Sequence, residues 1–522
     1  MILTEVFALQ QLGFPILSVL LWLPVAALAV LAFIRNERRA YEVALTVAGL
    51  EFLLSVFLLI VFRTGAADIQ FVEHPGAVLV GIDYHLGVDG ISALFVPLTT
   101  LLSLLAILYT EPAVKANVRG YVIAILGFEA TMIGAFVTLD LLLFWVFFVL
   151  ELIPSYFLIV RYGTGEKRHA AAKNYIGVMV AGAALILAGF VLLANNHAGS
   201  STDAGLSFNL IKLLTVPVPA ALQTGIFFLL CLGFAIKAPI FPFHTWMPRV
   251  LEQGPVVGMS VFLVGTKLGT YAFLRFVIPL LPEAAREWFW LLALMGALGM
   301  IYGALIALIQ TDLRRLLAFA SLSHMGVVMI GLFSLNFSGF QGGLLQMINL
   351  GACGAGLFFI AGFLYTRVGP PEIASLGGLF DHVPVLSIAF LVIGLASIGM
   401  PGTNGFNGEH LVIIGAYERH WLMAAAVGLG IFLSAAYFLL YYLRGFLGPV
   451  HNPMVRTLPD LDRREWTIVI SMGVLIFWIG LATSPFLHIM EGSLQALTER
   501  MAHGSYSTFV PGPVTEHGRS LR

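Results

Sequence analysis

The residues of this sequence that could do chemistry are ionisable side chains set inside long apolar stretches. Three are carboxylates and two are ammonium groups: Glu129, Glu151, Lys237, Lys267 and Glu409. An ionisable group at bilayer depth costs several kcal/mol unless it meets a partner or water, so each one suggests a function. A row of five such groups is hard to explain by packing alone, and it indicates a path for charge across a membrane.

Proton transfer is the chemistry that lysine and glutamate can perform together in such a place. A lysine in a low-dielectric setting can release its proton near neutral pH, and a neighbouring carboxylate opposes that release. Making and breaking a contact between Glu151 and Lys237 would therefore switch proton affinity, and we expect these two residues to pair. The alternative is that the buried charges form fixed ion pairs between helices.

One histidine extends this set. His324 lies in the sequence SLSHMG (321–326) within an apolar stretch. Imidazole has an unperturbed pKa of about 6.5 and could relay protons between the two halves of the chain. The alternative is a neutral histidine bonded to a serine or a carbonyl group. Glu51 is a weaker candidate, because it could face a neighbouring subunit or reach the membrane interface.

The composition supplies a membrane frame for these residues. Of 522 residues, 59% are hydrophobic and 11% are charged, and the mean hydropathy of +0.95 excludes a water-soluble globular protein. A formal net charge of -1 offers no basic surface for nucleic acid. Cys231 and Cys353 lack the spacing of zinc or iron–sulfur ligands, so we expect no metal, cofactor or catalytic redox centre in this chain.

Apolar stretches long enough to cross about 30 Å of hydrocarbon recur along the chain. They predict an all-α polytopic membrane protein of about fourteen transmembrane helices. The predicted spans are 15–34, 42–62, 91–110, 121–138, 141–160, 175–195, 222–240, 258–278, 288–309, 316–334, 342–365, 384–415, 421–442 and 467–487. Arginine and lysine are concentrated in the loops on one side, which places both termini on the outer or periplasmic side.

Two of these spans are interrupted. Pro239 and Pro242 break the seventh, and Pro401 and Gly402 break the twelfth a few residues before Glu409. Interrupted helices at membrane depth are tolerated where they are buried or line a wet cavity, and paired breaks mark transporter ion sites. The alternative is that these prolines form ordinary kinks.

The spacing of the two breaks predicts two inverted five-helix repeats. The repeats occupy residues 119–280, with helices 4–8, and 281–445, with helices 9–13. Helices 1–3 precede them in residues 1–118, and a loop, a last helix and a tail follow in 446–522.

Six stretches together resemble the antiporter-like subunits of proton-pumping NADH:quinone oxidoreductase, respiratory complex I. They are HLGVDGIS (85–92), FFVLELIPSYFLI (147–159), AIKAPIFPFHTWMP (235–248), KLGTYAFLRF (267–276), DLRRLLAFASLSHMG (312–326) and PGTNGFNGEH (401–410). The likeness is greatest to the subunit M group, also called subunit 4. Relatives that resemble subunits L and N usually carry lysine at the position of Glu409.

The resemblance implies a role for each matching residue. Glu151 and Lys237 resemble the essential glutamate and its lysine partner, and Lys267 resembles the connecting lysine. His324 resembles the histidine of the central axis, and Glu409 the terminal proton-exchanging residue.

The resemblance also implies a membrane-arm subunit without a redox group of its own, in a bacterial inner membrane or an equivalent energy-transducing membrane. Its partners would be L-like and N-like antiporter subunits, small membrane subunits, lipids and protons. Quinone, flavin and iron–sulfur clusters would belong to partner subunits.

Two departures from the family pattern leave alternatives open. The family usually reads LPDAHVEAP after the seventh break, whereas residues 247–255 lack its aspartate and histidine. Leu350 stands where the family motif QMxxHG has histidine. A cation/proton antiporter subunit of Mrp type, a membrane subunit of a complex I-like carbon dioxide-uptake complex, and a scaffold that has lost pumping are the alternative functions.

Overall fold

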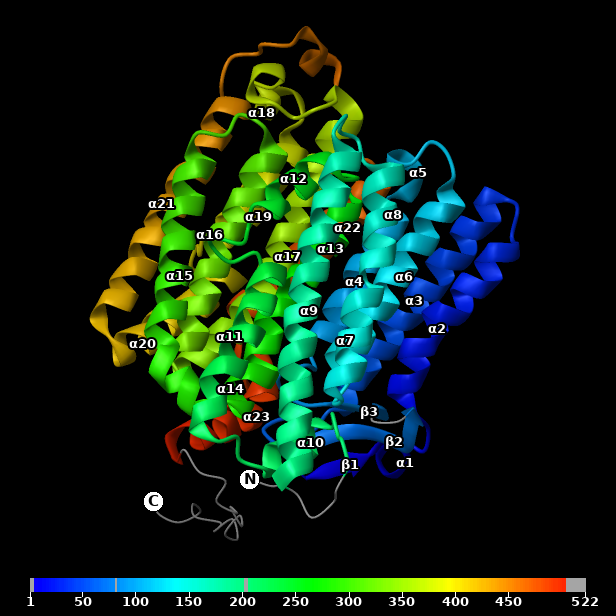
Figure 1. Cartoon of the computed structure of the whole chain (residues 1–522). Coiled ribbons are helices and arrows are strands. Elements are labelled where there is room, and N and C mark those ends of the chain that lie inside the picture. The colour runs from blue at the N-terminus through cyan, green and yellow to red at the C-terminus, as the bar shows by residue number, and fades with distance from the viewer. Residues whose placement is uncertain (1–3, 80–81, 201–204, 504–522) are drawn as a thin grey trace, which may run out of the picture.

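The computed structural model describes residues 4–79, 82–200 and 205–503. Within them, long helices run side by side to form a single bundle, with a small sheet at one end (Figure 1). Twelve helices of the described residues are long and apolar enough to cross a membrane. They are α2 (Ile16–Phe33), α3 (Glu37–Val61), α6 (Val118–Val137), α7 with α8 (Leu141–Leu150 and Leu152–Tyr162), α9 (Arg168–Ser200), α11 (Ala220–Lys237), α13 to α14 (Gly258–Leu280), α15 (Pro282–Leu308), α16 (Leu313–Phe333), α17 (Phe337–Val368), α21 (Trp421–Gly445) and α22 (Arg463–Leu481).

The predicted polytopic helical class is confirmed, but the number of fourteen spans is not. The third predicted span is α4 (Phe95–Leu108), which has only 14 residues. The twelfth is divided into α19 (Pro384–Ser397) and α20 (Asn404–Arg419), and neither half is long enough to cross alone. The arrangement of the helices as two inverted repeats stays a prediction.

A three-stranded sheet departs from the all-α expectation. It has the order β1-β2-β3, with β1 (Glu5–Phe7), β2 (Ile69–Leu79) and β3 (Ile82–Val88). Strands β2 and β3 form an antiparallel hairpin between the second and third predicted spans, where the sequence analysis placed no element. The pairing of the two strands satisfies backbone donors and acceptors of this segment.

The C-terminal region differs from expectation as well. After α22, helix α23 (Ser484–His503) runs along the end of the bundle that carries the sheet (Figure 1). The Ser493 hydroxyl accepts a hydrogen bond from the backbone nitrogen of Gly90, and so ties α23 to the turn after β3. Residues 504–522 of the predicted tail lie outside the described residues.

Both predicted helix breaks are present. Helix α11 ends at Lys237, and the chain turns through 238–245 before α12 (Trp246–Gln253). Helix α19 ends at Ser397, and α20 begins at Asn404. Gly399 and Gly402 have φ of +77° and +88°, a conformation that only glycine adopts without strain.

Three helices form the interior of the bundle. The most apolar 18-residue stretch of the α13 to α14 segment is 100% buried, and those of α16 and α17 are each 94% buried, against 28% for α3, α21 and α22. A helix that is apolar on all sides belongs in such an interior. Because Lys267 lies on α13 and His324 on α16, the protein itself shields both residues from lipid.

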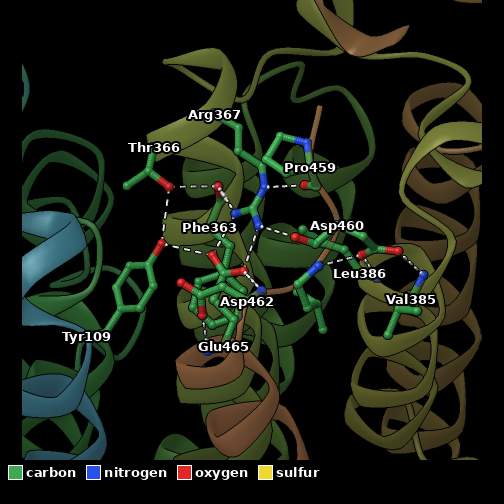
Figure 2. Close-up of polar contacts among 11 residues, drawn as sticks. Tyr109, Phe363, Thr366, Arg367, Val385, Leu386, Pro459, Asp460, Asp462 and Glu465 are labelled. Carbon is green, nitrogen blue, oxygen red and sulfur yellow. Dashed lines mark hydrogen bonds and ion pairs between the residues drawn. The ribbon is translucent and has the colours of Figure 1, made fainter. Parts of the chain in front are cut away.

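A polar cluster around Arg367 links several helices at the end of the bundle opposite the sheet (Figure 2). The guanidinium of Arg367, in the last turn of α17, forms two 2.6 Å bonds with the carboxylate of Glu465 on α22. The Tyr109 hydroxyl, next to α4, donates to Glu465 Oε1 over 3.1 Å. Arg367 also donates to the backbone carbonyl of Asp460. The carboxylate of Asp460 accepts hydrogen bonds from two backbone N–H groups in the first turn of α19. One cluster therefore fixes the ends of four helices.

Candidate functional site

A buried ion pair joins the first predicted proton-carrying residues. Glu151 lies between α7 and α8, and Lys237 is the last residue of α11, where the broken helix stops. Lys237 Nζ donates to Glu151 Oε2 over 2.5 Å, as the sequence analysis predicted. The exposed fractions are 0% for Glu151 and 1% for Lys237, so water and lipid are both excluded from the pair.

Two hydroxyl groups complete the surroundings of Glu151. Ser155 donates to Oε1 over 2.6 Å, one helical turn further along α8. The Tyr175 hydroxyl, from α9, donates to the same oxygen over 3.2 Å. The carboxylate thus has three donors from three helices, which compensate for its removal from water. Sequence reasoning missed both hydroxyl residues, because serine and tyrosine are common in membrane helices.

Helix α13 connects this pair to the next lysine. A side-chain carbon at Gly265 would lie 3.7 Å from Glu151 Oε1, so α13 passes directly beside the ion pair. Lys267 follows two residues later and is 2% exposed. Its ammonium donates to Thr266 Oγ1 over 3.4 Å, and it forms no ion pair with any of the described residues. Lys267 is therefore a buried lysine held without a fixed counter-charge.

A small cavity lies between Lys267 and the predicted histidine. Its volume is about 20 Å³, and its polar lining residues are Lys267, Ser321, His324 and Ser397. A cavity of this size accommodates one water molecule, which needs two to four polar partners. Leu350, at which the sequence analysis expects a departure from the family motif, also lines this cavity.

His324 on α16 and Glu409 on α20 approach each other beside the second break. His324 Nδ1 lies 3.9 Å from Glu409 Oε1, and the other ring nitrogen lies 3.2 Å from the Tyr437 hydroxyl of α21. Gln346, on α17, donates to Glu409 Oε1 over 3.4 Å. Neither Tyr437 nor Gln346 was predicted as a site residue, although Gln346 belongs to the motif that contains Leu350.

The second break also shapes the position of Glu409. Any side-chain carbon added at Gly399 would overlap Oε2 of the Glu409 carboxylate. The break therefore brings unwound backbone against the carboxyl group, an arrangement that interrupted helices commonly provide for ions.

The structure does not bring all six predicted residues into one group. It joins Glu151 with Lys237, and it places Lys267, His324 and Glu409 around the cavity and the second break. Glu129, on α6, has no hydrogen-bond partner among the described residues. Its carboxyl group lies beside that of Glu51 on α3 instead.

A helical bundle with two broken helices and buried Glu, Lys and His side chains defines a multi-pass membrane protein of the antiporter-like class. Residues 138–434 match the family described as NADH:quinone oxidoreductase/Mrp antiporter, transmembrane. The chain belongs to this family.

Curated relatives and solved structures agree with this assignment. NADH-quinone oxidoreductase subunit M of Rickettsia typhi is 34% identical over 500 residues, which cover 93% of this chain and 99% of the relative. NADH-ubiquinone oxidoreductase chain 4 of Arabidopsis thaliana is 35% identical over 495 residues, covering 94% and 98%. A chain of respiratory complex I from Thermus thermophilus superposes with a TM-score of 0.84 at 32% identity, covering 93% of this chain and 99% of that one. A chain of the Mrp complex from Dietzia shares the fold, with a TM-score of 0.80 at 21% identity and coverage of 94% and 99%.

Proposed function

We propose that this chain is a proton-translocating membrane-arm subunit of a complex I-type quinone oxidoreductase. The observation that carries the proposal is the Glu151–Lys237 ion pair, buried at the end of a broken helix and continued by Lys267 on the adjoining α13. The similarity to subunit M and chain 4 proteins over more than nine tenths of the chain supports it.

The geometry suggests how a proton would move. While Glu151 contacts Lys237, the ammonium has a counter-charge and keeps its proton. When the carboxylate moves away, the lysine is left in a dry, apolar place where the charged form is costly, and it gives up the proton. Lys267 accepts it beside the cavity.

The second half would complete the transfer. His324 receives the proton from Lys267 across the cavity, through one water molecule where Leu350 has replaced an imidazole. Glu409 then takes it from His324 and exchanges it with the outer side. The proposed direction is from the cytoplasm to the outer side, with both termini outside.

The energy for this cycle would come from neighbouring subunits. We propose that the chain holds no redox group, and that quinone, flavin and iron–sulfur clusters belong to its partners. L-like and N-like antiporter subunits and small membrane subunits would flank it, in a bacterial inner membrane or an equivalent membrane.

The substitution Glu151→Gln in the assembled complex tests the proposal. It removes the counter-charge of Lys237 and keeps the shape of the side chain, so the number of protons pumped per electron pair should fall by at least a half. Proton release and quinone reduction would be measured together in proteoliposomes. The control is Glu42→Gln, because Glu42 is exposed on α3. An unchanged ratio in Glu151→Gln would contradict the pumping role and favour a scaffold.

An Mrp-type cation/proton antiporter is the second candidate. The fold that the chain shares with the Dietzia Mrp complex favours it. Purification of the native assembly in mild detergent, followed by mass spectrometry, separates the two candidates. Flavin and iron–sulfur subunits in the assembly would support the first, and sodium-dependent transport by an assembly of membrane proteins alone would support the second.

A further inference from the structure

Two glutamates meet inside the bundle away from the Glu151–Lys237 pair. Glu51 on α3 and Glu129 on α6 are both 0% exposed, and their carboxyl groups are close neighbours. All four carboxyl oxygens are buried without a hydrogen-bond partner among the described residues. In Figure 1, α3 and α6 lie with α2 and α4 on the blue-to-cyan side of the bundle, which the first helices of the chain form.

A third polar group belongs to the same place. The hydroxyl of Ser103, on α4, lies near the Glu129 carboxyl and is itself buried without a hydrogen-bond partner among the described residues. Near it, Ser55 and Thr100 join α3 to α4 through a 2.7 Å bond between their hydroxyls. Buried polar side chains from three helices, Glu51, Ser103 and Glu129, therefore meet at the Glu129 carboxyl.

The charges nearest in sequence and packing are engaged elsewhere. Helices α2, α4 and α7 contain no charged residue, and Glu111 on α5 pairs with Arg464. Glu151 pairs with Lys237, and Lys267 on α13 faces the cavity shared with His324. The remaining charged or titratable groups on the packed elements lie near helix ends or in β3: Glu37, Arg38, Arg39 and Glu42 on α3, Arg119 on α6, Arg161 on α8, and Asp83 and His85 on β3.

Two ionised carboxylates cannot share this place, because neither would have a counter-charge or a donor apart from Ser103. A proton on one carboxyl supplies the missing hydrogen bond to the other, as in other buried carboxyl pairs. We infer that Glu51 and Glu129 form a carboxyl pair that binds an exchangeable proton, a site separate from the line of Glu151, Lys237, Lys267, His324 and Glu409.

The site deepens the proposed function, because it gives Glu129 a proton partner that the sequence did not reveal. One proton bridges the two oxygens in the singly charged state, and a second proton neutralises the pair. Since α3 is only 28% buried over its most apolar stretch, a neighbouring subunit packed on α3 could change this balance.

Infrared difference spectroscopy of the assembled complex, titrated from neutral to alkaline pH in H₂O and D₂O, tests the inference. The native complex should show a protonated-carboxyl C=O band that shifts in D₂O. Glu51→Gln and Glu129→Gln should each abolish or shift that band, whereas Glu42→Gln on the same helix α3 should not change it.

Three outcomes would overturn the inference. One is a spectrum in which neither Glu51→Gln nor Glu129→Gln alters a protonated-carboxyl band. Another is the disappearance of the band when sodium is added at constant pH, which would identify a cation site. If both glutamine variants fail to assemble, Ser103→Ala removes a single oxygen, and a band unmoved by that change would also overturn it.

These readouts need no turnover. The inference about the carboxyl pair can therefore be wrong while Glu151→Gln still impairs pumping. It can also be right while Glu151→Gln leaves pumping unaffected.

Discussion

At the scale of single residues, Leu350 is the departure with the clearest structural consequence. It lines the cavity between Lys267 and His324, so the proposed proton path would pass a leucine side chain and a space for one water molecule there. An apolar side chain cannot carry a proton, so the proposed transfer between Lys267 and His324 would have to pass beside Leu350.

We predict that Leu350→His raises the rate of proton pumping or leaves it unchanged, and that it adds an ionisation near the pKa of imidazole to the pH profile. The imidazole would face Lys267 and His324 directly. The measurement is the pumping rate between about pH 5.5 and pH 8.5, a range that includes the pKa of about 6.5 for free imidazole.

Leu350→Met is the control for this experiment, because it keeps an apolar side chain of similar volume. A Leu350→His profile that matches those of the control and the native complex would show that the proton does not pass this position.

At the scale of elements, the broken helix before Glu409 depends on a glycine with two separate requirements. Gly399 has φ of +77°, and any side chain there would meet the Glu409 carboxylate. Backbone conformation and carboxyl position are thus coupled in the break between α19 and α20.

We predict that Gly399→Ala destabilises the protein by about 1–3 kcal/mol, the usual range for a strained backbone conformation, and displaces the Glu409 carboxyl. The measurement is the midpoint of thermal unfolding of the assembled complex, together with its pumping ratio. Gly473→Ala is the control, because a side chain on α22 at that position meets nothing within 4 Å. Equal midpoints for the two variants would contradict the argument.

The sheet, at the end of the bundle opposite Arg367, contains three titratable side chains in contact: Glu5, His74 and His85. His85 Nε2 lies 3.0 Å from Glu5 Oε1, and the rings of His74 and His85 stack at 4.3 Å. The hydrogen bond with His85 lowers the pKa of Glu5 despite its partial burial. Burial lowers the pKa of His74 from its ordinary 6.5, and the neighbouring His85 lowers it further.

Both pKa directions predict that acid loosens the contact of β1 with the hairpin. The folded state binds fewer protons than the unfolded state at His74, so stability is lost as the pH falls below 6.5. The contribution of Glu5 is present above its unfolded pKa of 4.5 and is lost as the pH falls through its lower folded value.

Hydrogen exchange of the β1 and β2 amides measures this effect. After correction for intrinsic rates, protection should decrease between pH 7.5 and about pH 5. His74→Gln removes one titrating group and should flatten the upper part of this dependence. Protection that stays constant with pH in the native protein would refute the prediction.

At the scale of the whole molecule, the Arg367 cluster holds the ends of α4, α17, α19 and α22 in one place (Figure 2). The side chains of Arg367 and Glu465 are 9% and 3% exposed, so this pair is largely removed from water. Because α17 packs against α16, α13 and α20, a shift at its end would reach the helices that carry His324, Lys267 and Glu409.

We predict that Arg367→Met destabilises the molecule by about 3–5 kcal/mol, because it leaves the buried Glu465 carboxylate without its cation. The exposed Arg464–Glu111 pair supplies the control, and Arg464→Met should cost about 1 kcal/mol or less. Thermal unfolding of the assembled complex measures both. Similar losses in the two variants would show that burial of the Arg367–Glu465 pair has no energetic consequence.

The sequence by itself determined the membrane class, the positions of most spans and both helix breaks. These follow from hydropathy and from the backbone chemistry of proline and glycine, which are local properties of the chain. The cost of charge in a bilayer suggested that Glu151 pairs with Lys237, and the structure shows the contact. The tertiary structure alone decided that Tyr175 contacts Glu151, that Tyr437 contacts His324 and that Glu129 faces Glu51. Contacts of this kind depend on which helix faces meet after packing, and a common hydroxyl or a lone carboxylate gives no sign of its partner along the sequence.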